Sequence, residues 1–374
     1  MRIAIDATPL LLRSAGVKNY LYYWILHLRR LAGEGAISTF PAAMRIGPLD
    51  HEHSMSGPWA TLTGLGLLHL ANRSGLPVLN PLGRRADVFH ASHLLRNPPR
   101  NCRLTATLYD MTCWLMPEMH TPANVAAVKG FAERVIRRAD GLIAISESTR
   151  SDAARILGLE AERIEVIHPG VPDAFFEVPA EAVATVRERY GLARSYALFV
   201  GTVEPRKNLR VLLDAYLELP ASLREEFALI LAGPAGWGER ALVERLHSQG
   251  GGVRYLDYVP EADLPGLTAG ASLFVYPSLY EGFGFPVAQA MAAGVPVITS
   301  NVSSLPEITA GAAVLVDPRS VTELRAALER LLLAPAERAE LARQGTEVAR
   351  QYRWEFCAQR SLKFFEQAAG SRRV

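Results

Sequence analysis

The chain has 374 residues, of which 49% are apolar and 21% are charged. That balance excludes an intrinsically disordered chain, and the length suits two domains better than one. The formal net charge of +2 argues against a dedicated nucleic-acid-binding protein.

Charge is nevertheless uneven along the chain. Residues 1–170 carry 19 Lys/Arg and 14 Asp/Glu, a net of +5, whereas residues 171–374 carry 21 and 24, a net of −3. A basic N-terminal half suits an anionic partner such as a lipid phosphate or a membrane surface. An ordinary, slightly uneven surface would give the same count.

Cysteine use and the N-terminus bear on the compartment. Cys102, Cys113 and Cys357 form no CxxC pair and cannot all be joined, which favours a reducing compartment without structural zinc. The N-terminus has no signal-peptide cleavage pattern, and no apolar run is long enough to span a bilayer. We expect a cytoplasmic protein, with peripheral contact to the inner face of a membrane as an open alternative.

The first half of the chain alternates short apolar strands with amphipathic helices. Ser146 or Ser148 is the expected N-cap of the helix over 148–158. Pro169, Gly170 and Pro172 then break the chain before a connecting stretch with one helix over 173–192. The other expected elements are a helix over 19–31 and strands over 2–6, 86–92, 103–110, 141–146 and 164–170.

The same alternation restarts after the break. Strands are expected over 196–202, 227–233, 253–259, 272–278, 295–300 and 312–317, and helices over 208–219, 239–249, 286–294 and 321–333. Two such series predict two Rossmann-like, doubly wound α/β domains, with ligands at the carboxyl ends of the parallel strands. The final helix, residues 354–368, carries Phe356, Leu362, Phe364 and Phe365 and is expected to dock on the first domain.

The stretch "PSLYEGFGFPVAQAMAAGVPVITS", residues 277–300, follows one of these strands. Gly282 and Gly284 permit positive φ and close approach of a ligand to the backbone, and Pro286 suits the first turn of a helix whose N-terminus attracts a phosphate. Glu281 and Gln289 are suited to neutral hydroxyl groups. Phosphate and hydroxyl partners together indicate a nucleotide joined to a sugar.

A second phosphate feature is "FVGTVEPRKNLRVLL", residues 199–213. Gly201 ends a strand, and Arg206 and Lys207 precede a helix that Asn208 is expected to cap. Two cations at a helix start oppose the helix dipole, so they are better explained by a bound diphosphate than by solvation.

These stretches resemble the retaining, nucleotide-sugar-dependent glycosyltransferases of the GT-B fold, the "glycosyl transferases group 1" family. The motifs are "GTVEPRKN", "LDYV", the 277–307 stretch and, less tightly, "SAGVKNY" and "ADGLIAISESTRSDAARILG…IEVIHPGV". The resemblance implies two Rossmann-like domains facing a central cleft: an acceptor-binding domain of residues 1–170 plus 355–374, and a donor-binding domain of 171–354. It also implies transfer with retention, usually without a metal or other cofactor, in agreement with the absence of any DxD sequence.

The resemblance assigns roles residue by residue. It implies that Glu281 contacts the donor sugar, and that Gln289 stands where the family usually has a glutamate for the ribose hydroxyls. The stretch "ATLYDMTCWLMPE" places Tyr109 and Asp110 where the family has His-Asp, so no imidazole titrates at position 109. The catalytic set is Glu281, Arg206, Lys207, Tyr109 and Asp110, and the donor-binding set is Gly16, Gly201, Thr202, Tyr258, Val259, Gly282, Phe283, Gly284, Phe285 and Gln289.

The function expected from this resemblance is transfer of a hexose from a nucleoside diphosphate sugar to a saccharide or lipid-linked saccharide. GDP-mannose is favoured because "GTVEPRKN" resembles mannosyltransferase members, with UDP-glucose or a deoxysugar nucleotide as alternatives. A non-catalytic sugar-nucleotide binder or partner subunit is the competing interpretation, because both Tyr109 and Gln289 depart from the family. A same-fold epimerase or phosphorylase is a third.

Two other patterns do not support a site. The histidine pairs His90/His93 and His51/His53 lack a third ligand at metal-binding spacing and are expected in the acceptor cleft or in solvent. The "GPAGWG" stretch, residues 233–238, lacks the spacing of a dinucleotide-binding loop, so an NAD-dependent dehydrogenase is not predicted.

Overall fold

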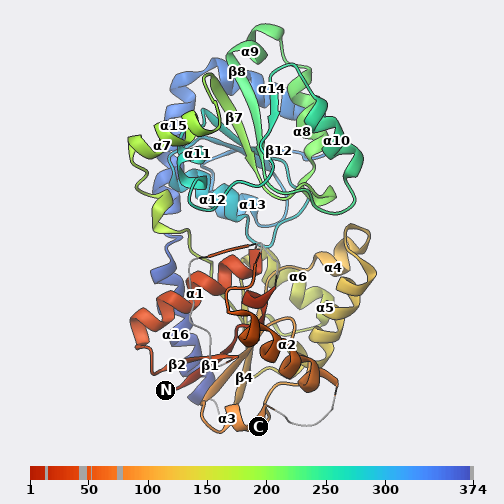
Figure 1. The fold of residues 1–374 in the computed structure, drawn as a ribbon, viewed down its shortest axis with the longest axis vertical. Coiled ribbons are helices and arrows are strands. Elements are labelled where there is room, and N and C mark those ends of the chain that lie inside the picture. The colour runs from red at the N-terminus through yellow and green to blue at the C-terminus, as the bar shows by residue number, and fades with distance from the viewer. Residues whose placement is uncertain (13–15, 42–48, 52, 74–78, 371–374) are drawn as a thin grey trace. The chain divides into compact units, whose positions relative to one another are not determined.

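The computed structural model describes residues 1–12, 16–41, 49–51, 53–73 and 79–370. The chain forms two compact units, one of Met1–Gly170 with Trp354–Val374 and one of Val171–Arg353 (Figure 1). Each unit contains one six-stranded sheet.

All paired strands of the first unit run parallel, in the order β2-β1-β3-β4-β5-β6. The strands are β1 (Ile3–Asp6), β2 (Ile37–Phe40), β3 (Val88–Ala91), β4 (Arg103–Leu108), β5 (Gly141–Ala144) and β6 (Ile164–Val166). The α-helices are α1 (Gly16–Ala32), α2 (Pro58–Arg73), α3 (Asn80–Gly83), α4 (Thr112–Leu115), α5 (Pro122–Arg134), α6 (Glu147–Leu157) and α16 (Trp354–Gly370).

The second unit repeats this architecture, with parallel strands in the order β12-β11-β10-β7-β8-β9. The strands are β7 (Ser195–Val200), β8 (Phe227–Ala232), β9 (Val253–Tyr255), β10 (Leu273–Tyr276), β11 (Val297–Ser300) and β12 (Val314–Val316). The helices are α7 (Ala180–Arg189), α8 (Leu209–Leu217), α9 (Ala221–Glu226), α10 (Arg240–Ser248), α11 (Leu264–Ala269), α12 (Phe285–Ala292), α13 (Leu305–Thr309), α14 (Val321–Leu333) and α15 (Pro335–Ala349).

Central strands are buried along their whole length. Every residue of β1, β3, β5, β8, β10 and β11 is buried, as expected for strands covered on both faces. The sequence did not predict β2, whose residues Ser38 and Thr39 interrupt the apolar pattern at the sheet edge. It also did not predict the helices α2, α3, α4, α5, α9, α11, α13 and α15.

Helix α16 packs on α1 within the first unit. The indole Nε1 of Trp24 donates to Ser361 Oγ at 2.9 Å, and the Trp24 and Phe365 rings lie 5.8 Å apart. Phe364 and Phe365 are buried, which confirms their predicted docking on this unit, whereas Phe356 is exposed and does not take part.

The predicted caps have different outcomes. Ser146 caps α6, since its hydroxyl accepts from Thr149 N at 3.1 Å. Asn208 precedes α8 but its side chain does not cap the helix: its amide donates to Pro277 O at 3.0 Å and to Pro318 O at 2.6 Å. Asn208 therefore ties the loop after β7 to the loops after β10 and β12.

Gly170 meets Trp354 so closely that a side chain has no room. A Cβ at Gly170 would lie 2.2 Å from Trp354 N and 2.4 Å from Trp354 Cα, both of which are backbone atoms. We expect Gly170→Ala to destabilise the protein by about 1–3 kcal/mol in urea unfolding.

Gly130 is the matched control for this substitution. It lies inside α5 with nothing within 4 Å of a built Cβ, so Gly130→Ala should raise stability by about 0.5–1 kcal/mol through helix propensity. Equal midpoints for the two variants would contradict the packing described at Gly170.

Candidate functional site

The order of strands reverses in the second unit between β7 and β10. The chain adds β8 and β9 on one side of β7, then returns to add β10, β11 and β12 on the other. At such a reversal the loops leaving the two carboxyl ends diverge and form a crevice that binds ligands in open α/β sheets. The loop with Gly201, Arg206 and Lys207 leaves β7, and the loop with Glu281 leaves β10.

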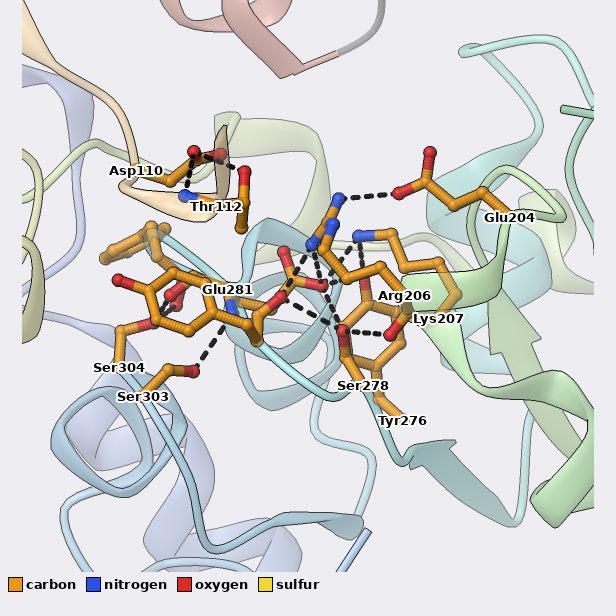
Figure 2. A network of polar contacts seen from close by, with 12 residues as sticks. Asp110, Thr112, Glu204, Arg206, Lys207, Tyr276, Ser278, Glu281, Ser303 and Ser304 are labelled. Carbon is orange, nitrogen blue, oxygen red and sulfur yellow. Dashed lines mark hydrogen bonds and ion pairs between the residues drawn. The ribbon is translucent and has the colours of Figure 1, made fainter. Parts of the chain in front are cut away.

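The two loops join through a buried ion cluster (Figure 2). Glu281 Oε1 lies 2.6 Å from Lys207 Nζ and 2.9 Å from an Arg206 guanidinium nitrogen. Arg206 also binds Glu204 at 2.7 Å and donates to Tyr280 O at 2.6 Å. The sequence predicted these residues as site members, but did not predict that the acid and the two cations pair with one another.

Neutral donors complete the surroundings of the carboxylate. Ser278 Oγ donates to Glu281 Oε1 at 2.6 Å, and Tyr276 OH donates to the same oxygen at 3.1 Å. Ser303 Oγ accepts from Glu281 N at 2.9 Å, and Ser304 Oγ donates to Glu281 O at 3.0 Å (Figure 2). The backbone and the side chain of Glu281 are thus both fixed.

These contacts set the ionisation of the cluster. Burial opposes the charged form of Glu281, but Arg206 and Lys207 more than offset it and lower the pKa of the carboxyl to about 2. Burial and the neighbouring Arg206 lower the pKa of Lys207, against the opposing effect of Glu281. Burial also raises the pKa of Tyr276, which therefore stays a hydrogen-bond donor.

Helix α12 begins directly after this cluster. Gly284 has φ +97°, and a Cβ there would lie 2.8 Å from Leu305 Cδ2, so the position requires glycine. Gly282 and Phe283 are buried in the preceding loop, and Phe285 starts the helix.

Gln289 lies on α12, four residues after Phe285. The residue is 8% exposed, and its amide, which makes no hydrogen bond to the described residues, is not among the fully buried side-chain groups that lack a partner. An accessible amide on a largely buried residue is suited to a ligand that both donates and accepts hydrogen bonds.

The other predicted donor-site residues lie on the loops after β7, β8 and β9. Gly201 and Thr202 leave β7, and a Cβ at Gly233, after β8, would lie 2.0 Å from Gly201 O. Gly233 N donates to Asp257 O at 2.7 Å, so the loop after β9 lies beside the loop after β8. The loop after β9 contains the exposed Tyr258 and the buried Val259. The "GPAGWG" stretch therefore packs on the "GTV" stretch rather than forming a dinucleotide-binding loop.

In the first unit a pocket of about 170 Å³ opens after β4, between α4 and α5. Tyr109, Asp110 and His93 line it together with Trp114 and apolar side chains. Tyr109 packs edge-on against Tyr20 at 5.3 Å, and burial raises the pKa of its hydroxyl. Gly16 starts α1, and nothing lies within 4 Å of a built Cβ there.

A hydrogen-bonded chain in this pocket was not predicted from the sequence. Thr112 donates from N and Oγ1 to Asp110 Oδ1 at 3.0 and 2.7 Å (Figure 2), and His120 Nε2 lies 2.8 Å from Thr112 Oγ1. Because the Thr112 hydroxyl proton points to Asp110, His120 must donate from Nε2, and its Nδ1 accepts from Asn124 at 3.2 Å. Spacing alone gives no signal for this chain.

Comparison with known proteins decides the family. The model "Glycosyltransferase Family 4" matches residues 15–175, and "Glycosyl transferases group 1" matches residues 187–348. The O-antigen chain mannosyltransferase B of Escherichia coli is 37% identical over 274 residues, which are 72% of this chain and 71% of that protein. The chain belongs to the group 1 glycosyltransferases. It is a nucleotide-sugar-dependent enzyme, as the sequence predicted.

Two further likenesses accompany this relative. The chain is 29% identical to the serotype-specific mannosyltransferase WbdA of Escherichia coli over 234 residues. This match spans 61% of the chain but only 29% of WbdA. Anabaena HepE in complex with UDP and glucose has a TM-score of 0.71 and 20% identity over 98% of this chain and 100% of its own. This likeness confirms the GT-B fold.

The histidine predictions are partly wrong. His90 of the glycosyltransferase lies in the sheet core, where its ring nitrogens are 3.0 Å from Thr105 Oγ1 and Thr107 Oγ1, and burial lowers its pKa to about 3. His93 does line the pocket, and its Nδ1 is buried without a partner among the described residues. His53 is exposed beside Asp50.

Two features are absent from the described ranges. No three of their His, Cys, Asp or Glu side chains are grouped so as to hold a metal ion. None of the helices within those ranges has the length and apolar character to cross a bilayer.

The pKa of Glu281 predicts a pH dependence of stability. The folded pKa of about 2 lies below the unfolded value of 4.5. The ionised carboxylate therefore contributes stability that is complete above about pH 5 and is lost as the pH falls toward 2. We expect wild type to exceed Glu281→Gln in unfolding free energy at pH 7, and that difference to shrink by about 2 kcal/mol at pH 3.

Glu366→Gln is the control, because Glu366 is exposed on α16. Its urea-unfolding difference from wild type should stay within about 0.5 kcal/mol at pH 7. A difference between wild type and Glu281→Gln that does not change between pH 7 and pH 3 would contradict the low pKa of Glu281.

Proposed function

We propose that this glycosyltransferase moves mannose from GDP-mannose to a saccharide or lipid-linked saccharide, with retention, in the assembly of a cell-surface polysaccharide. The main support is the 37% identity to an O-antigen chain mannosyltransferase over most of both chains. The solved complex with UDP and glucose is of a protein that is 20% identical to this chain, and a likeness of that size extends to the fold only. Mannose is therefore preferred over glucose.

The donor would bind at the reversal between β7 and β10. Arg206 and Lys207 would hold the diphosphate, aided by the N-terminus of α12. An anion approaching these cations competes with Glu281 for them, so the carboxylate would become available to hydroxyls of the donor sugar. Gly201, Thr202, Gly282, Phe283, Gly284 and Phe285 would surround the sugar and diphosphate, and Tyr258 and Val259 the base.

In this proposal the acceptor hydroxyl attacks the anomeric carbon on the face that the diphosphate leaves. The new bond forms from the acceptor oxygen as the bond to the diphosphate oxygen breaks, and the hydroxyl proton passes to the departing phosphate. The stabilisation of the leaving group by Arg206 and Lys207 is electrostatic. No titrating imidazole at position 109 is needed for this step.

Residues 1–170 and 355–374 would bind the acceptor, with Gly16 nearest the reacting groups. Asp110 would accept a hydrogen bond from an acceptor hydroxyl, since Thr112 and the ring of His120 hold it in place. Tyr109 would donate to a sugar hydroxyl or stack on the sugar ring. We place the reaction on the cytoplasmic side of a membrane if the acceptor is lipid-linked.

The purified full-length protein tests the donor. GDP-mannose should raise its Tm and should be consumed with release of GDP when a mannose-containing acceptor is added. UDP-glucose, dTDP-glucose and ADP-glucose serve as comparisons. A larger Tm shift and faster turnover with one of these nucleotide sugars would identify it as the donor in place of GDP-mannose. Binding without turnover under any acceptor would favour a non-catalytic binder.

Gln289 offers a sharper test of the donor orientation. Gln289 is a largely buried residue whose amide makes no hydrogen bond to the described protein, so Gln289→Leu should weaken binding of GDP by roughly tenfold in calorimetry through the lost ribose contact. Gln289→Glu should bind GDP at least as tightly as wild type does, because an ionised acceptor makes stronger hydrogen bonds. Unchanged affinity in Gln289→Leu would place the ribose elsewhere.

A further inference from the structure

Helix α2 has the reverse of the usual surface pattern. Its inward face consists of Gly64, Leu68 and Ala71, two of which are among the smallest residues. A Cβ at Gly64 would lie 2.5 Å from Pro41 Cγ and 2.9 Å from Leu11 Cδ1, so the helix lies close against the unit. Close packing is achieved by small residues, and large apolar ones remain outside.

The outward face carries these large residues. Trp59 is 82% exposed, Leu62 65%, Leu70 51% and Leu67 44%. Trp59, Leu62 and Leu70 are separated by three and eight residues, which places them on one stripe of the helix, with Leu67 at its margin. Among the described residues twelve large hydrophobics are exposed, and these four are the ones that share an element, since the others are scattered.

Arginines follow α2 in the sequence, whereas the two acids Asp50 and Glu52 precede it. Residues 54–109 contain six arginines and a single acid, Asp87. Asp87 accepts from Arg2 N at 2.7 Å, so it is already engaged. The arginines, Arg73, Arg84, Arg85, Arg96, Arg100 and Arg103, account for the whole positive excess of the first 170 residues.

Two of these arginines lie at the C-terminal end of α2. Arg73 is its last residue, and the loop with Arg96 is fixed beside it: Asn72 accepts from Arg96 N at 2.8 Å and donates to Leu94 O at 2.9 Å. Both arginines are exposed, and neither forms an ion pair with another described residue. Apolar side chains thus lie next to positive charge on the same surface.

We propose that the outward face of α2 is a docking surface for an anionic phospholipid bilayer. A tryptophan, leucines and flanking arginines on one helix face are typical of helices that lie in a membrane interface. The charge decides for lipid over a second copy of the chain, because two such surfaces would repel. The surface deepens the proposed function, on which its biological use rests, by bringing the enzyme to a lipid-linked acceptor.

Vesicle flotation tests the surface directly. Full-length protein should bind phosphatidylcholine vesicles with about 30% phosphatidylglycerol, and far less those of phosphatidylcholine alone. Raising NaCl from about 0.05 to 0.5 M should weaken binding. Leu62→Ser should lower partitioning by roughly tenfold, whereas Leu333→Ser, a leucine 64% exposed on α14, should not. Arg73→Gln should weaken binding, and Arg240→Gln should not.

Depth of insertion gives a second readout. Lipids brominated on the acyl chains should quench the fluorescence of wild type, and this quenching should be lost in Trp59→Phe, which keeps the other tryptophans. Equal flotation of wild type and Leu62→Ser, or no binding to anionic vesicles, would overturn the proposal. So would a dimer of wild type in sedimentation that Leu62→Ser abolishes.

The activity assay separates this inference from the proposed function. GDP release with a water-soluble acceptor should be the same in wild type and Leu62→Ser, because α2 has no part in the chemistry. Normal turnover without vesicle binding refutes the docking surface alone. Vesicle binding without turnover on any nucleotide sugar refutes the proposed function alone.

Discussion

The second unit depends on one buried carboxylate. Glu281 Oε1 forms ion pairs with Lys207 and Arg206 and accepts hydrogen bonds from Ser278 and Tyr276. These partners come from β10 and from the loops after β7 and β10. Burying such charges is tolerated because each has an opposite neighbour, and removal of one partner would leave the others uncompensated. The reversal of strand order therefore becomes a fixed polar site rather than an open gap between two loops.

The first unit also has a buried acid at its reversal of strand order, but with uncharged hydrogen-bond donors around it. Its strand order reverses between β1 and β3, and Asp6 at the end of β1 accepts from Ser92 Oγ and from Thr8 N and Oγ1 across that point. Burial raises the pKa of Asp6, whose hydrogen-bond partners among the described residues are hydroxyl and backbone N–H groups rather than cations. Each sheet thus has a buried acid at its reversal of strand order.

The sequence predicted what depends on local pattern. Buried strands, the cap at Ser146, the start of α12 near Pro286 and the family motifs all follow from neighbouring residues. It did not predict that Glu281 pairs with Arg206 and Lys207, because strand order brings distant loops together. His90 was placed wrongly because its partners, Thr105 and Thr107, lie on the next strand, with Thr105 directly in register with it. Helix α2 was missed because its large apolar residues do not form one buried face: Leu68 is buried, whereas Trp59 and Leu62 are exposed.

Hydrogen–deuterium exchange with and without GDP tests the central claim most directly, that the reversal between β7 and β10 is the donor site. We predict that GDP slows exchange in residues 201–208 and 277–289 and leaves β6 and α5 unchanged. Because both loops share the ion cluster, they should respond together at the same GDP concentration. Slowing confined to other segments, at concentrations where calorimetry shows GDP bound, would contradict the account.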